Sequence, residues 1–178
     1  MSQREALREL QARLAERMHA ARTEERRTGW LAVEAAGQGF LFPLDQSGEI
    51  FSEAELCPLA HTQPWFRGVA NLRGGLHGVV DLATFLGLRD QVPPDAARDA
   101  ARLVALNPAL GALCALRVDR LAGLRNADQL TAEPDAGSRP AFARGVWRDA
   151  QGQRWQAIDL GELAAQEQFL SIAAAQAA

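Results

Sequence analysis

Histidine and cysteine are the residue types best suited to acid–base, nucleophilic or metal chemistry near neutral pH, and this chain contains few of them. Its three histidines are His19, His61 and His77, and no cysteine or second histidine follows any of them within four residues. The close spacing that is typical of metal ligands is therefore missing. The sequence predicts no metal site, no cofactor and no catalytic residue.

Motifs for nucleophilic and nucleotide chemistry are absent as well. No serine lies in a Gly-x-Ser-x-Gly pattern, and a chain without lysine has no P-loop. The glycines of Arg73-Gly74-Gly75 precede a strand-like run, whereas a phosphate site of this kind needs a helix N-terminus. Asp81 and Asp159 each precede a helix-like run, and we interpret them as N-caps rather than as an acid and a base. We therefore expect a protein that is not an enzyme.

Recognition chemistry remains, and Arg73 is its candidate. A guanidinium at the tip of a hairpin can present a planar and permanently charged group to carboxylates on a partner. The alternative is an ordinary solvated turn residue, and spacing alone does not separate the two.

Composition narrows the class of protein. The chain has 178 residues, of which 48% are apolar, and this suits one domain or two small subdomains that share a core. The net charge is −3 without a basic cluster, so we expect no nucleic-acid partner. Cys57 and Cys114 are expected to be reduced, packed thiols. No secretion signal and no membrane-spanning segment are evident, which predicts a cytoplasmic protein without direct membrane insertion.

The elements that must position Arg73 are clearest between residues 65 and 88. Two apolar runs, 69–72 and 76–82, flank Arg73-Gly74-Gly75, and the glycine pair can supply the positive φ of a tight hairpin. Asp81 then caps a short helix, which Gly87 ends. This stretch predicts a hairpin closed by a helix.

A weaker copy of the same pattern lies at 142–165. There, a strand-like run passes through a turn and reaches Asp159, and Glu162 completes the spacing of a capping box. Only two copies at a long period indicate two similar subdomains rather than a solenoid, although chance similarity is a second explanation.

Other segments complete a mainly β body. Further hairpins are predicted from runs 30–33 with 40–44, 102–106 with 113–118, and within 146–158. Residues 49–51 predict a strand, and Leu121 and Leu124 predict either a strand or an exposed apolar ridge. Segments 57–64 and 131–140 are predicted loops, and 89–102 is a predicted exposed connector.

Helices are expected at both ends. Residues 2–27 carry a narrow apolar stripe that predicts one amphipathic helix, which could pack on its own body, pair with another chain or serve as a docking arm. Residues 160–172 predict a short C-terminal helix, and 173–178 a tail.

The central stretch resembles the signature of the CheW-like domain family. The run Trp65-Phe66-Arg67-Gly68-Val69-Ala70-Asn71-Leu72-Arg73-Gly74, followed by Val79-Val80-Asp81-Leu82, is its most specific part. Weaker similarity covers residues 30 to about 165. The resemblance implies one domain over 28–172, built from two intertwined SH3-like five-stranded β-barrel subdomains packed face to face.

The resemblance also implies a function and a site. Such proteins are non-catalytic adaptors that couple a methyl-accepting chemotaxis receptor to a CheA-type histidine kinase in membrane receptor arrays. Carried over by position, the receptor-binding residues are Arg73, Glu49, Ile50 and Leu121, and Gly68, Asn71, Leu72 and Gly74 lie nearest the surfaces for kinase or receptor. The N-terminal extension and the tail 168–172 are most similar to adaptors of type IV pilus (twitching) pathways.

Two departures from the family pattern bear on this site. Gly78 stands where the family usually has proline, and Ser47-Gly48 replace a more apolar pair before Glu49. Two other functions stay open from the residues alone. One is a ligand-binding or enzymatic barrel with a cleft around His77 and Trp155, and the other is self-association through residues 1–27.

Overall fold

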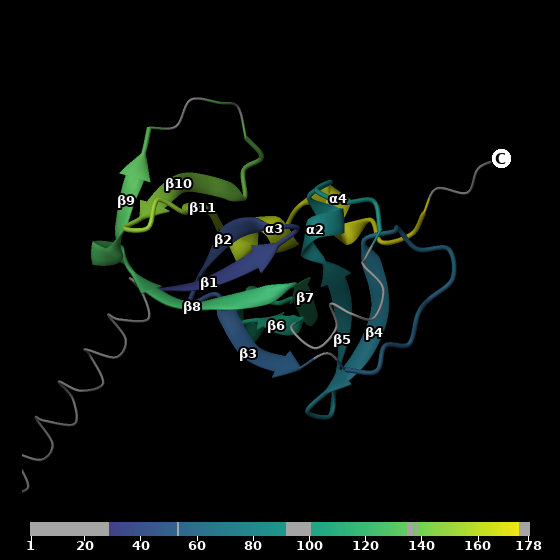
Figure 1. Ribbon diagram of the computed structural model, residues 1–178. Coiled ribbons are helices and arrows are strands. Elements are labelled where there is room, and N and C mark those ends of the chain that lie inside the picture. The colour runs from purple at the N-terminus through teal and green to yellow at the C-terminus, as the bar shows by residue number, and fades with distance from the viewer. Residues whose placement is uncertain (1–28, 53, 92–100, 135–136, 138, 175–178) are drawn as a thin grey trace, which may run out of the picture.

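The computed structural model describes residues 29–52, 54–91, 101–134, 137 and 139–174 (Figure 1). The helix predicted for 2–27 lies outside these residues, as do most of the connector and the end of the tail. The described part is mainly β, as predicted, and it forms two sheets. No helix among the described residues is long and apolar enough to cross a membrane.

One sheet has six strands in the order β8-β1-β2-β11-β10-β9. These are β1 Gly29–Ala35, β2 Gln38–Pro43, β8 Arg120–Asn126, β9 Leu130–Glu133, β10 Ala143–Asp149 and β11 Arg154–Ile158. The other sheet has five strands in the order β3-β6-β7-β5-β4. These are β3 Ser47–Ser52, β4 Phe66–Leu72, β5 Gly75–Asp81, β6 Arg102–Leu106 and β7 Cys114–Val118.

The two sheets exchange strands. β1 and β2 form a hairpin in the six-stranded sheet, but the next strand, β3, joins the five-stranded sheet beside β6. In return, β6 and β7 form a hairpin in the five-stranded sheet, and β8 crosses to pair with β1. Each sheet therefore takes one edge strand from the chain segment that builds the other.

Apart from β9, the sheets have matching connectivity. In one, β5 pairs with β7 in parallel and places Val79 opposite Ala115; in the other, β11 pairs with β2 in parallel and places Ala157 opposite Leu41. When the two parallel pairs are aligned, β5 matches β11 and β7 matches β2. The strand orders then make β3 the counterpart of β8, and β4 the counterpart of β10. A residue in one sheet can therefore be compared with its counterpart in the other.

Helix caps follow each closing hairpin, as the aspartates predict. Asp81 Oδ1 accepts a hydrogen bond from the Thr84 backbone N–H at 2.9 Å and begins α2 (Leu82–Phe85). Asp159 Oδ1 accepts one from the Glu162 N–H at 3.0 Å and begins α3 (Leu160–Ala164). The expected capping box is incomplete because the Asp159 N–H bonds to the carbonyl of Phe142, as the Asp81 N–H bonds to that of Trp65.

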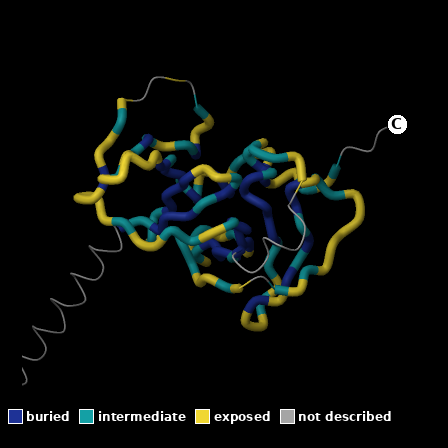
Figure 2. The backbone as a smooth tube through the Cα atoms, viewed as in Figure 1, coloured by how far each residue is buried: buried dark blue, intermediate teal, exposed yellow. Residues whose placement is uncertain are grey.

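The main core lies between the sheets, where the tube of Figure 2 is dark blue. It includes Phe40 and Phe42 from one sheet and Leu116 and Val118 from the other. Each sheet also encloses a smaller cluster on its other side, one around Trp155 and one around Val79. Burial of this apolar surface is the dominant stabilising term.

Strand β9 begins one residue before the segment 131–140 that was predicted as a loop, and its other three residues lie within that segment. It pairs with β10, buries Leu130, and gives one sheet a sixth strand where five were expected. Its pairing residues are far along the chain, so local composition did not indicate it. Pro134 comes directly after the strand, at a position where a ladder N–H would be needed to continue it.

The C-terminal helix is also different from the prediction. It divides into α3 and α4 (Glu167–Leu170) because Gln166 has extended backbone angles. The turn seats Phe169 against Trp65, with ring centroids 6.2 Å apart and nearly parallel, and against Phe85 at 5.4 Å. Two short 3₁₀ turns, Pro108–Leu110 and Ala127–Gln129, complete the described elements.

Candidate functional site

The tip of the β4–β5 hairpin presents Arg73. Leu72 pairs with Gly75, so the loop contains only Arg73 and Gly74, and both have positive φ, +49° and +81°. The Asn71 side-chain oxygen accepts a hydrogen bond from the Gly74 N–H at 2.8 Å and stabilises the turn. We expected Gly74 and Gly75 to provide the positive φ values; instead Arg73 takes one of them, which directs its side chain outward, with 77% exposed.

An ion pair joins Arg73 to Glu49 on β3. The Arg73 Nη2 and Glu49 Oε1 atoms are 2.8 Å apart. β3 and β4 are the two edges of the five-stranded sheet, so this contact joins one edge to the turn that follows the other. Because both groups are exposed, the pair contributes at most about 1 kcal/mol to stability.

A shallow hollow of about 450 Å³, here called the Arg73 hollow, lies between these two edges. Its lining consists of Glu49, Ile50, Phe51, Ser52, Ala54, Asn71, Leu72 and Arg73. Five of the eight predicted site residues are therefore brought together. They supply one cation, one anion, an amide and an apolar wall, which are the groups of a recognition surface.

Leu121 lies elsewhere, on β8. Leu121 pairs with Val33 in the six-stranded sheet, and Ile50 pairs with Val104 in the five-stranded sheet. Val33 and Val104 are both part of the main core, so Leu121 and Ile50 are on the sheet faces that look toward each other. Leu124 is the β8 counterpart of Ile50, because it is opposite Leu31, and it is 62% exposed. The sequence predicted either a strand or an exposed apolar ridge for Leu121 and Leu124; both residues lie on strand β8, at the edge of its sheet.

Gly68 and Leu72 are buried on strand β4, and of the two only Leu72 lines the Arg73 hollow. Leu72 packs in the cluster around Val79. Gly68 has φ +116°, and a Cβ built there would lie 2.2 Å from the carbonyl oxygen of Cys57. Close approach of two backbones is what this position requires.

The two departures from the family pattern have local accommodations. Gly78 lies beside the ring of Phe66, which a Cβ would approach to 3.1 Å, and its N–H bonds to the carbonyl of Leu113 at 3.0 Å. Gly48 lies against the backbone of Leu106, where a Cβ would meet the carbonyl oxygen at 2.9 Å. Glycine at both positions therefore permits close packing.

A buried charge cluster, which we call the Asp81 cluster, was not predicted. It contains Asp81, Arg89, Arg117 and Asp119, and the side chains of Asp81 and Arg117 are 0% and 1% exposed. Burial by itself would raise the pKa of Asp81, but hydrogen bonds from Arg89 and Thr84 outweigh it and hold that pKa below its ordinary value. The one feature of the sequence that could have indicated this cluster is Arg117, which lies within the apolar run of β7.

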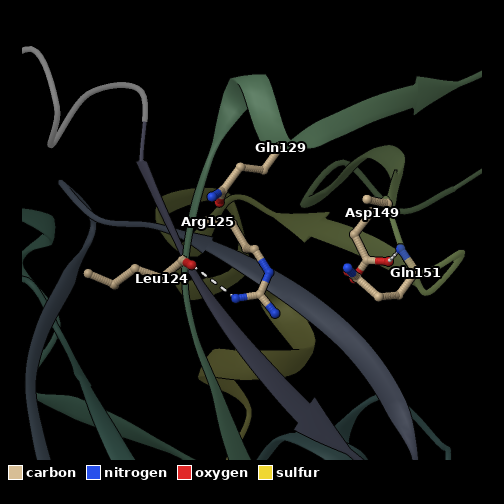
Figure 3. Close-up of a pocket in the computed structure, with 6 residues that line it drawn as sticks. Leu124, Arg125, Gln129, Asp149 and Gln151 are labelled. Carbon is tan, nitrogen blue, oxygen red and sulfur yellow. Dashed lines mark hydrogen bonds between the residues drawn. The ribbon is translucent and has the colours of Figure 1, made fainter.

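A second hollow, of about 290 Å³, lies at the far end of the six-stranded sheet (Figure 3). The Arg125 guanidinium lies 5.5 Å from the ring centre of Trp155. Burial would raise the pKa of Asp149, but hydrogen bonds from Trp155 and from the backbone of Gln153 lower it. Asp149 thus holds the β10–β11 turn, much as Asn71 holds the β4–β5 turn.

His77 and Trp155, the centre of the alternative enzymatic interpretation, belong to different sheets. A hollow of about 430 Å³ is lined by Trp155 with Arg139, Arg154 and other polar residues, and His77 is not part of its lining. His77 Nδ1 is 3.0 Å from the carbonyl oxygen of Gly75. Among the described residues, no group of three or more histidine, cysteine, aspartate or glutamate side chains could hold a metal ion.

Both cysteines are free thiols in the structure. Cys114 is buried, and burial raises the pKa of its thiol to about 12, so it stays protonated and unreactive at neutral pH. Cys57 is exposed on the loop before β4.

Comparison with known proteins places this geometry in a family. The model of the CheW-like domain matches residues 29–168. Protein PilI of Pseudomonas aeruginosa is 28% identical over 154 residues, covering 80% of this chain and 79% of PilI. The crystal structure of the scaffolding protein TtCheW from Thermoanaerobacter tengcongensis superposes with a TM-score of 0.63 at 17% identity, covering 80% of this chain and 95% of TtCheW. The chain therefore belongs to the CheW-like domain family.

Proposed function

We propose that this protein is a non-catalytic adaptor of a bacterial chemosensory pathway, which couples a methyl-accepting receptor to a CheA-type histidine kinase. Family membership supports the adaptor class, and the solved relative is itself titled a scaffolding protein. The observation that carries the proposal is the Arg73 hollow, where three of the four residues expected at the receptor site, Arg73, Glu49 and Ile50, line one exposed surface.

The hollow fits one partner chemistry. A receptor hairpin tip would place a carboxylate against Arg73, a polar or basic group near Glu49 and an apolar side chain against Ile50. Leu121 and Leu124, on β8 of the other sheet, would give the same partner a second apolar contact. The exposed turn at Asn71 and Gly74 remains available to the kinase or the receptor.

The pathway and location are part of the same proposal. Similarity of the N-terminal extension and of residues 168–172 to type IV pilus adaptors, together with the PilI relative, favours control of twitching motility. The protein would act in the cytoplasm at membrane receptor arrays, with its N-terminal segment as a candidate for self-association.

Reversing the charge of Arg73 tests the receptor surface. Arg73→Glu is expected to weaken binding to a purified cytoplasmic receptor fragment from the same genome by at least about tenfold, or about 1.4 kcal/mol. The new carboxylate would repel both Glu49 and the acidic group of the partner. Isothermal titration calorimetry would measure the affinity, and circular dichroism would check the fold.

Arg154→Glu is the matched control. Arg154 is also exposed and paired, with its Nε 2.8 Å from Glu133 Oε2, but it lies on the six-stranded sheet. It should bind the receptor fragment as the wild type does. Equal losses in both variants would indicate nonspecific electrostatics, and unchanged binding of Arg73→Glu would remove Arg73 from the interface.

A further inference from the structure

Strand β8 depends on a one-residue crossover. β7 ends at Val118 in the five-stranded sheet, and β8 begins at Arg120 in the six-stranded sheet, so Asp119 alone connects them. Leu121 and Leu124 follow directly on β8. Whatever holds Asp119 therefore sets where these apolar side chains lie relative to the other sheet.

Asp119 is held by contacts from both sheets. Its backbone N–H donates to the carbonyl of Glu34 at 2.8 Å, and its Oδ2 accepts from the Ala36 N–H at 2.7 Å, both at the β1–β2 turn. From the other side, Arg89 Nη1 lies 2.9 Å from each carboxylate oxygen of Asp119, and Arg117 Nη1 makes a longer contact of 3.6 Å to its Oδ1.

Arg89 bridges this crossover to the buried cap of α2. Its Nη2 donates to Asp81 Oδ2 at 2.7 Å while Nη1 contacts Asp119, so one guanidinium joins two carboxylates from different elements. The Arg89 side chain is only 13% exposed. Charge-assisted contacts in such a partly buried place are stronger and more directional than surface pairs.

The equivalent crossover in the other half uses neutral chemistry. Between β2 and β3, Gln46 donates to Asp159 Oδ1 at 3.3 Å and accepts from the Leu160 N–H at 2.7 Å. The arginine that contacts that cap, Arg144, is 54% exposed and lies 3.0 Å from Asp159. Only the crossover that leads into β8 has a buried ionic bridge.

We propose that Arg89 is a positioning residue for partner binding: by joining Asp81 to Asp119 it fixes strand β8, and with it Leu121 and Leu124, against the five-stranded sheet. This inference rests on the proposed adaptor function. Arg89 does not line the Arg73 hollow, and it would act on Leu121 and Leu124 through Asp119.

The test uses the full chain with Arg89→Met and the matched control Arg144→Met. Arg89→Met is chosen because Asp81 keeps Arg117 and Thr84, and Asp119 keeps the Ala36 N–H and only the longer contact to Arg117, so we expect the fold to persist. Hydrogen exchange of the free protein should accelerate at least about tenfold in β8 residues 120–126, but not in β3. Affinity for the receptor fragment should fall roughly five- to tenfold. Arg144→Met should change neither.

A second variant distinguishes the placement of strand β8 from the overall stability of the protein. Asp119→Asn keeps an acceptor for Ala36 but removes the charge that Arg89 bridges, and it should show the same two effects. Faster exchange in β8 with unchanged affinity, or unchanged exchange, would overturn the inference. Failure of the wild type to bind the receptor fragment would overturn the proposed function instead, and the exchange data would still decide whether Arg89 holds β8.

Discussion

Asp81→Ala is expected to lower the free energy of unfolding by about 3–5 kcal/mol, because it removes the carboxylate nearest to the buried guanidinium of Arg117, whose contact to Asp119 is longer, at 3.6 Å. Arg117 Nη1 lies 3.2 Å from Asp81 Oδ2, and the Arg117 side chain is inaccessible to water. The same substitution removes the cap of α2 and the contact to Arg89. Urea denaturation followed by circular dichroism would measure the loss.

Asp159→Ala provides the matched control, because Asp159 caps the equivalent helix. Its arginine partner, Arg144, is exposed, so this variant should lose only about 1 kcal/mol, the usual contribution of an N-cap. Equal losses for both aspartates would show that the Asp81 cluster contributes no more than its cap.

The contribution of the Asp81 carboxylate to stability should also be seen in the dependence of the unfolding free energy on acid pH. The folded pKa of Asp81 lies below its unfolded value, so the stability it contributes is complete above the unfolded pKa of about 3.9 and is lost as the pH falls through the folded pKa. We expect the unfolding free energy of the wild type to drop below about pH 4. The drop should be smaller in Asp81→Asn, and an identical acid profile for the two proteins would contradict this.

Gly68→Ala is expected to destabilise the protein by about 3–5 kcal/mol, because backbone strain and a backbone clash coincide there. The residue has φ +116°, and the new Cβ would lie 2.2 Å from the Cys57 carbonyl oxygen. Cys57 and Val69 exchange backbone hydrogen bonds at 2.8 and 2.9 Å, so relief of the clash would break this bridge. Urea denaturation is again the measurement.

Gly74→Ala separates strain from clash. Gly74 also has positive φ, +81°, but no atom lies within 4 Å of the added Cβ. It should lose only about 1–2 kcal/mol, the cost of a left-handed alanine. If Gly68→Ala lost no more than this, the close approach to Cys57 would not be what requires glycine at 68.

The features predicted from sequence were the local ones. The β4–β5 hairpin and the caps at Asp81 and Asp159 depend on residues within a few positions of each other, and composition indicates them directly. Ion pairs such as Arg73 with Glu49 join residues far apart in the chain. The family resemblance named both residues but not their contact.

The features that were missed depend on long-range packing. Strand β9 exists because β10 offers it a partner, and α4 separates from α3 because Phe169 finds the ring of Trp65. Arg117 was hidden in an apolar run, since a single sequence does not indicate whether an arginine in a strand points outward or pairs inside.

The exchanged strands bear on how the chain can be synthesised. β2, near the start, finds its parallel neighbour only when Trp155 and Ala157 have been made, and β1 must wait for β8. A nascent chain on the ribosome can therefore supply all strands of the five-stranded sheet once β7 has been made, but the six-stranded sheet stays incomplete, with exposed strand edges that need protection, until β11 has emerged. A chaperone that holds the growing chain should raise the yield of this protein more than that of one whose halves fold in sequence.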